Sequence, residues 1–323
     1  MFKAVTLLKF FLLSTFFAVT LAAQTTTPEE HIRGQDQTFL TYPEWFLVHS
    51  PTEYASFLET QKPGNFPWFG HVGQFWQSYE SVFRRVKDVY PFNGEYHVML
   101  MTIGVSTTVE YAVKGLYEFT IGRLTEAISS NRMTDEDRVA YEEATLYAEF
   151  ILRQPWYEFD YLGSLRKLWF ETSFFDRDIV RKLERKYILT SEYLIKAFYA
   201  WLIEQGAAAS FDAPLHKTAV VTAEGALNYF PRYRPFTHEA VSFANTGGNF
   251  IEIAGNRESV VLSLLTTANW NAESIMAKTL FTQAIITVEG QSRHVIELKV
   301  KDLAEALRSI ELSKLQLEHI YDY

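Results

Sequence analysis

Apolar residues recur at three- and four-residue steps through the first two thirds of the chain, which predicts amphipathic helices. One stripe predicts a helix over about 72–86 and consists of Val72, Phe75, Trp76, Tyr79, Val82, Phe83 and Val86. A longer helix is predicted over about 95–128, with a core face formed by Val98, Met101, Val105, Val109, Ala112 and Leu116. Its uncharged stretch, Val98–Val109, is 12 residues long, which is typical of a buried helix rather than a membrane span.

Capping residues predict where other helices begin. Thr41 with Glu44, and Ser50 with Glu53, each have the spacing of a capping box, so one helix is predicted to start after each. Thr134 is predicted to cap a further helix, because acidic residues fill the first turn after it. Three more helices are predicted over 161–170, 176–187 and 191–205. The apolar side of the last one consists of Leu194, Ala197, Phe198, Trp201 and Leu202.

The period of the pattern changes after Gly206, a usual stop signal for a helix. Segments rich in β-branched and apolar residues then predict strands over 218–223, 250–254, 260–266, 281–288 and 295–300. Helices are predicted between them, over about 236–246 and 301–312. Residues 239–256 and 305–323 each run from a helix through a short loop to a strand. Two strand–helix–strand units sharing one sheet are therefore predicted, with the final strand in that sheet.

The fold class is predicted to be mainly α plus α+β. The predicted parts are a flexible polar lead (24–37), an aromatic-rich, multi-helix N-terminal domain (38–206), a linker (207–217) and a C-terminal α+β sandwich of the ferredoxin-like type (218–323). The chain contains no cysteine, so its stability must come from packed cores rather than disulfides. About 300 residues are enough to form such cores.

The N-terminus has the three parts of a secretory signal. Lys3 and Lys9 provide positive charge, Phe10–Ala23 is uncharged, and small residues precede the polar Gln24. Residues 1–23 are therefore predicted to be a signal peptide. The alternative is an uncleaved membrane anchor over residues 4–23. Both alternatives place the folded chain outside the cytoplasm, either periplasmic or otherwise extracytoplasmic, or tethered to a membrane by its N-terminus.

Composition excludes some partners. The chain has 30 basic and 39 acidic residues and a net charge of -9, which argues against nucleic acid. The same charge argues against simple attraction to anionic lipid. Hydrophobic residues make up 48% and aromatic residues 16% of the chain, so it is not of a disordered type. The aromatic content is explained either by an aromatic core or by a binding cleft.

Motifs for catalysis and cofactors are missing from the sequence. No glycine-rich phosphate loop ends in Lys-Ser/Thr, and His238 lacks the second histidine of a zinc-protease helix. Gly104 lacks the second glycine of a nucleophile elbow, and the helical region has no Glu-x-x-His pair for a di-iron site. Thiolate sites are excluded by the lack of cysteine. No metal and no cofactor is therefore predicted.

Four weaker groups could carry chemistry, and two lie early in the chain. The first consists of Tyr42, Glu44, Trp45 and His49. A carboxylate and an imidazole about one turn apart could act as acid and base, although Glu44 could simply complete the capping box. The second is His71, with Gln74 and Ser78 beside it on the flank of an apolar stripe. The alternative for His71 is a hydrogen-bonded structural role.

The other two groups contain more carboxylates. Glu110 follows His97 on the long helix and could donate a proton if its apolar surroundings raised its pKa. The alternative is a surface pair with Lys114, one turn later. Glu158 and Asp160 lie in an aromatic run, where rings could stack on a sugar and the carboxylates could cleave a glycosidic bond. The alternative is an aromatic corner that caps the next helix.

Two functional hypotheses follow. The first is an exported or membrane-tethered cell-envelope protein that is not an enzyme and acts as a binding or assembly component for a protein or small-molecule ligand. The second is an envelope hydrolase that acts on carbohydrate through Glu44, Glu110, Glu158 and Asp160. If three of these carboxylates converged with His71 or His97 in one cleft, the enzyme hypothesis would gain support.

Overall fold

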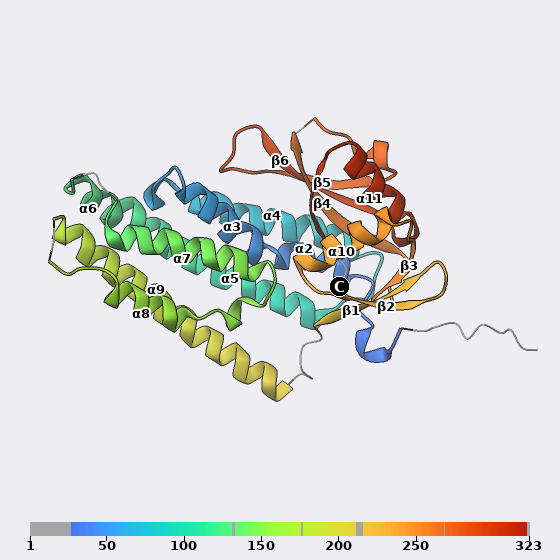
Figure 1. Cartoon of the computed structure of the whole chain (residues 1–323), viewed down its shortest axis with the longest axis horizontal. Helices are drawn as coiled ribbons and strands as arrows, with labels where there is room; N and C mark the ends of the chain where they lie inside the picture. Colours follow the sequence, from blue (N-terminus) through green and yellow to red (C-terminus); the bar gives the residue numbers. More distant parts are fainter. Residues whose placement is uncertain (1–26, 131–132, 176, 211–215, 268, 322–323) are drawn as a thin grey trace, which may run out of the picture.

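The computed structural model describes residues 27–130, 133–175, 177–210, 216–267 and 269–321. The predicted signal peptide lies outside the described residues. A helical part comes first and a region of antiparallel sheet follows, as predicted, and about 59% of the described residues are helical (Figure 1).

The helical part contains the short 3-10 turns η1 (Glu29–His31), η2 (Pro63–Asn65) and η4 (Trp156–Glu158) and the π-helical turn η3 (Glu118–Gly122). Its α-helices are α2 (Gln37–Glu44), α3 (Phe46–Leu58), α4 (Trp68–Val86), α5 (Gly94–Tyr117), α6 (Arg123–Ala127), α7 (Asp135–Ile151), α8 (Tyr161–Phe170) and α9 (Ile179–Ser210).

The second part contains β1 (Lys217–Thr222), β2 (Leu227–Pro231), α10 (Arg234–Asn245), β3 (Phe250–Ile253), β4 (Ser259–Thr267), η5 (Ala272–Ile275), β5 (Lys278–Ala284), β6 (Gln291–Lys299), η6 (Val300–Asp302), α11 (Leu303–Leu312) and β7 (Gln316–Ile320). The strands form two sheets, in the orders β2-β1-β3 and β5-β6-β4-β7. The prediction of a single shared sheet was therefore wrong. The prediction that the last strand lies in a sheet is confirmed, because β7 pairs with β4.

The four-stranded sheet is covered on both faces. Val260 and Leu262 of β4 pack into one core with residues of α10 and α11. Val261, which lies between them, packs with Val295 of β6 and with residues of the helical part in a second core. Because side chains alternate between the faces of a strand, β4 and β6 join the two parts of the chain (Figure 1).

Several helix boundaries differ from the prediction. The α2 helix starts at Gln37, so Thr41 lies inside it and its hydroxyl donates to the Gln37 carbonyl instead of capping a helix. Ser50 likewise lies inside α3 and does not cap its start. The two helices predicted over 176–187 and 191–205 are one helix, α9, which continues through Gly206. The prediction at Thr134 is confirmed, because its side chain caps α7 in a capping box with Asp137.

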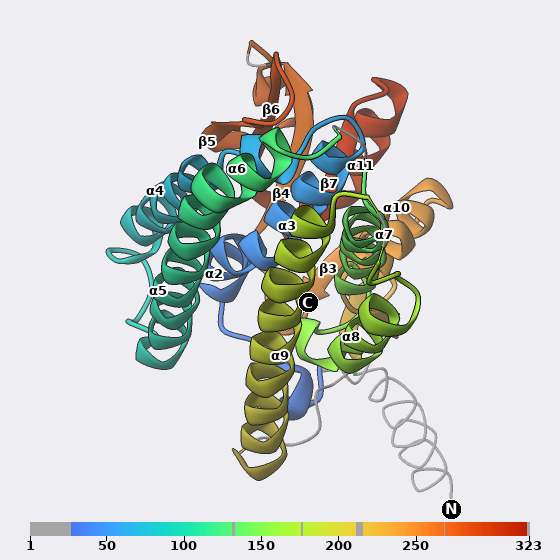
Figure 2. The same cartoon turned by 90° about the vertical axis from the view of Figure 1, so that its left-hand side faces the viewer.

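The orientation of α5 is the largest difference from the prediction. The face predicted to line the core is turned outward, and its Val98 and Val109 are 68% and 58% exposed. The buried face instead consists of His97, Leu100, Gly104, Thr107, Tyr111 and Gly115. Small residues let α4 pack closely here, since a Cβ on Gly104 would clash with the rings of Phe75 and Trp76. Figure 2 shows α5, α8 and α9 at the periphery of the helical part.

Candidate functional site

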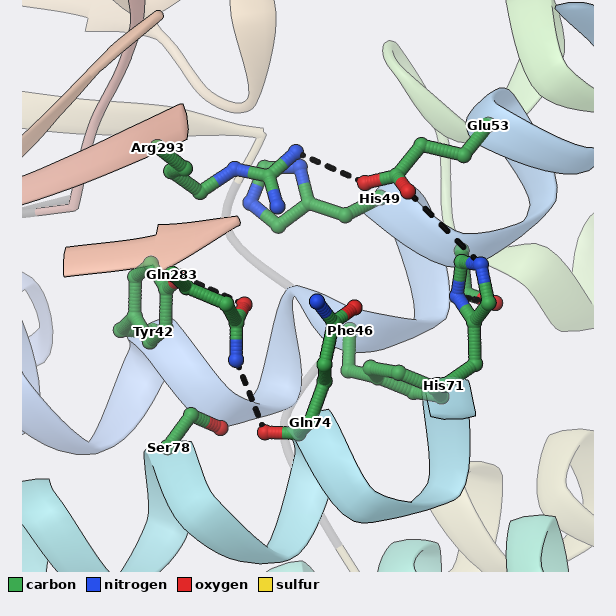
Figure 3. Close-up of a pocket in the computed structure, with 10 residues that line it drawn as sticks. Tyr42, Phe46, His49, Glu53, His71, Gln74, Ser78, Gln283 and Arg293 are labelled. Carbon is green, nitrogen blue, oxygen red and sulfur yellow. Dashed lines mark hydrogen bonds and ion pairs between the residues drawn. The ribbon is translucent and has the colours of Figure 1, made fainter. Parts of the chain in front are cut away.

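A buried polar cluster lies between the helical part and the four-stranded sheet (Figure 3). Its centre is Arg293 of β6, whose guanidinium donates to both carboxylate oxygens of Glu318 on β7 at 2.6 and 2.7 Å. Arg293 also donates to Glu53 of α3 at 3.1 Å. Burial would lower the pKa of Arg293, but the two carboxylates outweigh that effect and hold it well above its usual value. Arg293 therefore connects two strands to the helical part.

His49 of α3 continues the cluster. Its Nδ1 lies 3.3 Å from a Glu318 oxygen, and its Nε2 is 2.8 Å from the hydroxyl of Tyr321. The Tyr321 hydroxyl also lies 2.9 Å from the Ser263 hydroxyl on β4. His49, Tyr321 and Ser263 are buried, and Glu318 is nearly so. Arg293 lowers the pKa of Glu318 to about 2 although burial alone would raise it. The contacts therefore place an ionised carboxylate beside an imidazole.

Ser50, His71 and Glu53 form a second branch that contains the residue types of a catalytic triad. The Ser50 hydroxyl lies 3.0 Å from His71 Nδ1 and 2.7 Å from the Tyr111 hydroxyl. His71 Nε2 is 3.7 Å from Glu53, which is too long for a hydrogen bond. The serine side chain is buried, and the imidazole presents Nδ1 to it, whereas serine hydrolases present Nε2.

The cavity inside this cluster is small. It is lined by residues of both branches and holds about 10 Å³, room for roughly one water molecule. Burial and the nearby charge of Arg293 lower the pKa of both His49 and His71 to about 3, so both imidazoles are neutral near pH 7. A cluster with so little free volume and so many internal partners is suited to joining the two parts of the protein. It offers no space for an organic substrate.

The structure does not bring the four predicted carboxylates together. Glu44 is half-buried and accepts a hydrogen bond from the Tyr96 hydroxyl. Glu110 is half exposed and pairs with Lys196 at 3.6 Å, so the predicted pairing with Lys114 was wrong. Glu158 and Asp160 are exposed.

The predicted aromatic-corner role fits Asp160, which accepts a hydrogen bond from the Gly163 amide and caps α8. His97 is likewise separate from His71: it stacks on Phe92, and its Nδ1 is 3.0 Å from the Tyr79 hydroxyl.

Sequence reasoning found some members of the buried cluster and missed others. His49, His71, Gln74 and Ser78 were candidates, and Tyr42 was grouped with His49; all five line the cavity. Arg293 and Glu318 were missed, because more than 200 residues separate them from α3 and only the sheet brings them together. Glu53 was assigned only a capping role. No group of three or more His, Asp or Glu residues suited to a metal ion occurs in the described residues.

A second unusual feature is the charged interior of the helical part. Arg185 of α9 donates to Glu118 at 2.6 Å, and Lys186 lies 3.3 Å from Glu136 of α7. Arg181 lies 3.1 Å from Asp137. The side chains of Lys186 and Glu136 are only 2% and 0% exposed. Charged groups of α9 therefore point inward, where η3, α5 and α7 supply their ionised partners.

The outside of the same helices is apolar. Exposed large apolar residues of α5 and its continuation are Val98, Met99, Met101, Val105, Val109, Val113, Leu116, Phe119, Ile121, Leu124 and Ile128. Those of α9 are Ile179, Val180, Leu183, Tyr187, Leu194, Ile195, Phe198, Tyr199, Trp201, Leu202 and Ile203. We call these two stripes the outer apolar surface. Soluble monomers rarely expose a contiguous apolar patch beyond roughly 300–600 Å². At about 80 Å² for each large side chain, each stripe alone is of that size or larger, so these stripes indicate an interaction.

Within the described part of the chain, no helix is both long enough and apolar enough to cross a membrane.

Comparison with known proteins adds no assignment: no protein-family model, no curated protein and no solved structure matches the chain.

Proposed function

We propose that this protein is an exported or membrane-tethered component of the cell envelope that binds or assembles through its outer apolar surface and is not an enzyme. The observation that carries the proposal is the inverted polarity of α5 and α9, with ion pairs inside and large apolar side chains outside. Such an arrangement costs free energy in water, because apolar side chains stay hydrated while charges are desolvated. A covering partner removes the first of these costs.

The buried polar cluster supports a structural role for the junction. Arg293, Glu53 and Glu318 join α3 to β6 and β7, so the sheet region holds the helical part in a fixed orientation. We also propose a ferredoxin-like relation for the sheet region, supported by its β2–α10–β3 and β6–α11–β7 segments. Carbohydrate hydrolysis receives less support, since its four carboxylates have separate surroundings.

Thiol labelling in cells tests the proposal, because the natural chain has no cysteine and each introduced cysteine is unique. Leu312→Cys, Val105→Cys and Phe198→Cys each occupy a position that is exposed in the chain alone. We expect a membrane-impermeant maleimide to label Leu312→Cys before the inner membrane is broken. We expect the other two cysteines to react only after detergent or urea treatment.

Two outcomes contradict the proposal. If Leu312→Cys reacts only after lysis, the chain is not exported. If Val105→Cys and Phe198→Cys react as fast as Leu312→Cys in intact cells, the outer apolar surface is uncovered in its natural setting. Labelling of the unfolded chain in urea gives the same full reaction for all three variants and serves as the reference.

A further inference from the structure

We infer that the outer apolar surface lies against the hydrocarbon region of a lipid bilayer. This inference rests on the proposed function and names the partner that covers the surface. It concerns the outside of the helical part as a whole and not one spanning helix.

The charged side chains of α9 avoid the outer apolar surface. Between Ile179 and Ile203, every charged side chain is turned toward the interior and has an ion-pair partner. The most exposed of them, Lys196, is only 26% exposed. The outward side over this stretch therefore carries no unpaired charge. At 1.5 Å per residue the stretch is about 36 Å long.

The interior of the helical part contains ion pairs and small residues at helix contacts. Charged residues of helices in lipid face the bundle interior and pair with one another, as Arg185 with Glu118 and Lys186 with Glu136 do here. Small residues at contacts between helices are also typical of packing in lipid. Gly104 and Gly115 of α5 have this role, because a Cβ at Gly115 would lie 3.0 Å from Trp68.

The area of the outer apolar surface is also large. The side chains of the outer apolar surface are about half exposed, so together they present on the order of 1,500 Å², taking about 80 Å² for each large side chain. A standard interface with one protein partner covers about 800 Å² per side, and the larger obligate interfaces cover roughly 1,000–2,500 Å² per side. The stripes of α5 and α9 also belong to different helices at the periphery of the helical part (Figure 2). Bilayer hydrocarbon is continuous and can contact both stripes at once, whereas a single docked protein would have to reach both helices.

The chain preceding the described residues is consistent with the same partner. It contains the uncharged run Phe10–Ala23, for which the sequence predicts export or membrane anchoring. With a net charge of -9, the chain gains nothing from anionic headgroups, so the expected attraction is hydrophobic and independent of lipid charge.

Fluorescence quenching with the full chain in neutral phosphatidylcholine vesicles tests the inference. Bimane is attached to Val105→Cys, Phe198→Cys or Leu312→Cys, and far-UV circular dichroism verifies that each labelled protein is folded. We expect spin-labelled phosphatidylcholine to quench the probes at 105 and 198 at least twofold more than iodide in the water does. At 312, which is 85% exposed on α11, we expect iodide to be the stronger quencher.

Other results of this experiment distinguish lipid from a protein partner and from a second copy of the chain. Probes at 105 and 198 that are shielded from iodide but not quenched by spin-labelled lipid overturn the lipid inference and leave the proposed function in place. If a second copy carrying a spin label at the same position quenches them instead, the partner is another chain. Probes at both positions that iodide quenches as strongly as the probe at 312 overturn the lipid inference, and the labelling in intact cells then decides separately whether a protein covers the surface.

Discussion

Acid is expected to weaken the junction between the helical part and the four-stranded sheet, because His49 and His71 are buried there as neutral groups. Burial, assisted by Arg293, lowers the pKa of each to about 3, whereas an unfolded chain has a histidine pKa of about 6.5. The folded pKa lies below the unfolded one, so protonation favours the unfolded chain. The stability linked to each histidine is complete above about pH 6.5 and is lost as the pH falls from there toward 3.

The magnitude follows from the size of these shifts. At pH 5 the unfolded chain is about 1.5 units below its histidine pKa, while the folded imidazoles remain neutral. Each histidine then costs about 2 kcal/mol of unfolding free energy relative to pH 7.5, and the two together cost about 4 kcal/mol. Total stabilities are roughly 5–15 kcal/mol, so the loss is large enough to measure.

The assay is urea unfolding of the full chain in a mild non-ionic detergent at pH 7.5 and pH 5, followed by tryptophan fluorescence. Trp45 is buried beside the cluster and stacks on His319. The variant His71→Asn removes one titrating group, so between the two pH values we expect it to lose about 2 kcal/mol less than the natural chain loses.

The matched control is His238→Asn, at an exposed position on α10, which should lose as much stability as the natural chain does. The reasoning is refuted if the natural chain is equally stable at both pH values. It is also refuted if His71→Asn loses as much stability as the natural chain.

Three further outcomes are expected. Arg293→Met leaves Glu53 and Glu318 buried without their cation and should cost about 3–5 kcal/mol in urea unfolding at pH 7.5; a loss below about 1 kcal/mol would contradict the pairing. Deletion of residues 317–323 removes the strand that pairs with β4 and should yield aggregated chain, so a soluble truncation with unchanged melting would argue against this role. Thr134→Ala removes the cap of α7 and should cost about 1 kcal/mol, whereas Thr134→Ser should cost much less.

Periodicity was a good guide to the type of element. The strands at β1, β3, β4 and β6 and the helices at α4, α8, α10 and α11 occupy nearly the predicted ranges. The helix starts predicted at Thr41 and at Ser50 were both wrong, because each of these residues lies inside a helix. A capping box is a local pattern, and it does not start a helix when the residues before it are themselves helical. Here Phe39 and Leu40 pack in the core, so the helix begins before Thr41.

The direction in which a stripe faces could not be predicted in the same way. Periodicity shows that Val98, Val105 and Val109 share one side of α5, but not whether protein or another partner lies against that side. The decisive information is the partner of each charged side chain, such as Glu118 with Arg185, and these partners are 67 residues apart. The same reasoning applies to Arg293, whose carboxylates come from α3 and β7.

The most direct test of the inverted polarity is a spin-label scan along α5 in mild detergent. Single cysteines between positions 98 and 109 carry a nitroxide, and electron paramagnetic resonance line shapes report its mobility. The account predicts mobile labels at Val98, Val105 and Val109 and immobilised labels at Leu100 and Thr107. The opposite phase, with mobile labels at Leu100 and Thr107 and immobilised labels at the valines, would show that the apolar stripe faces the core and would contradict the account.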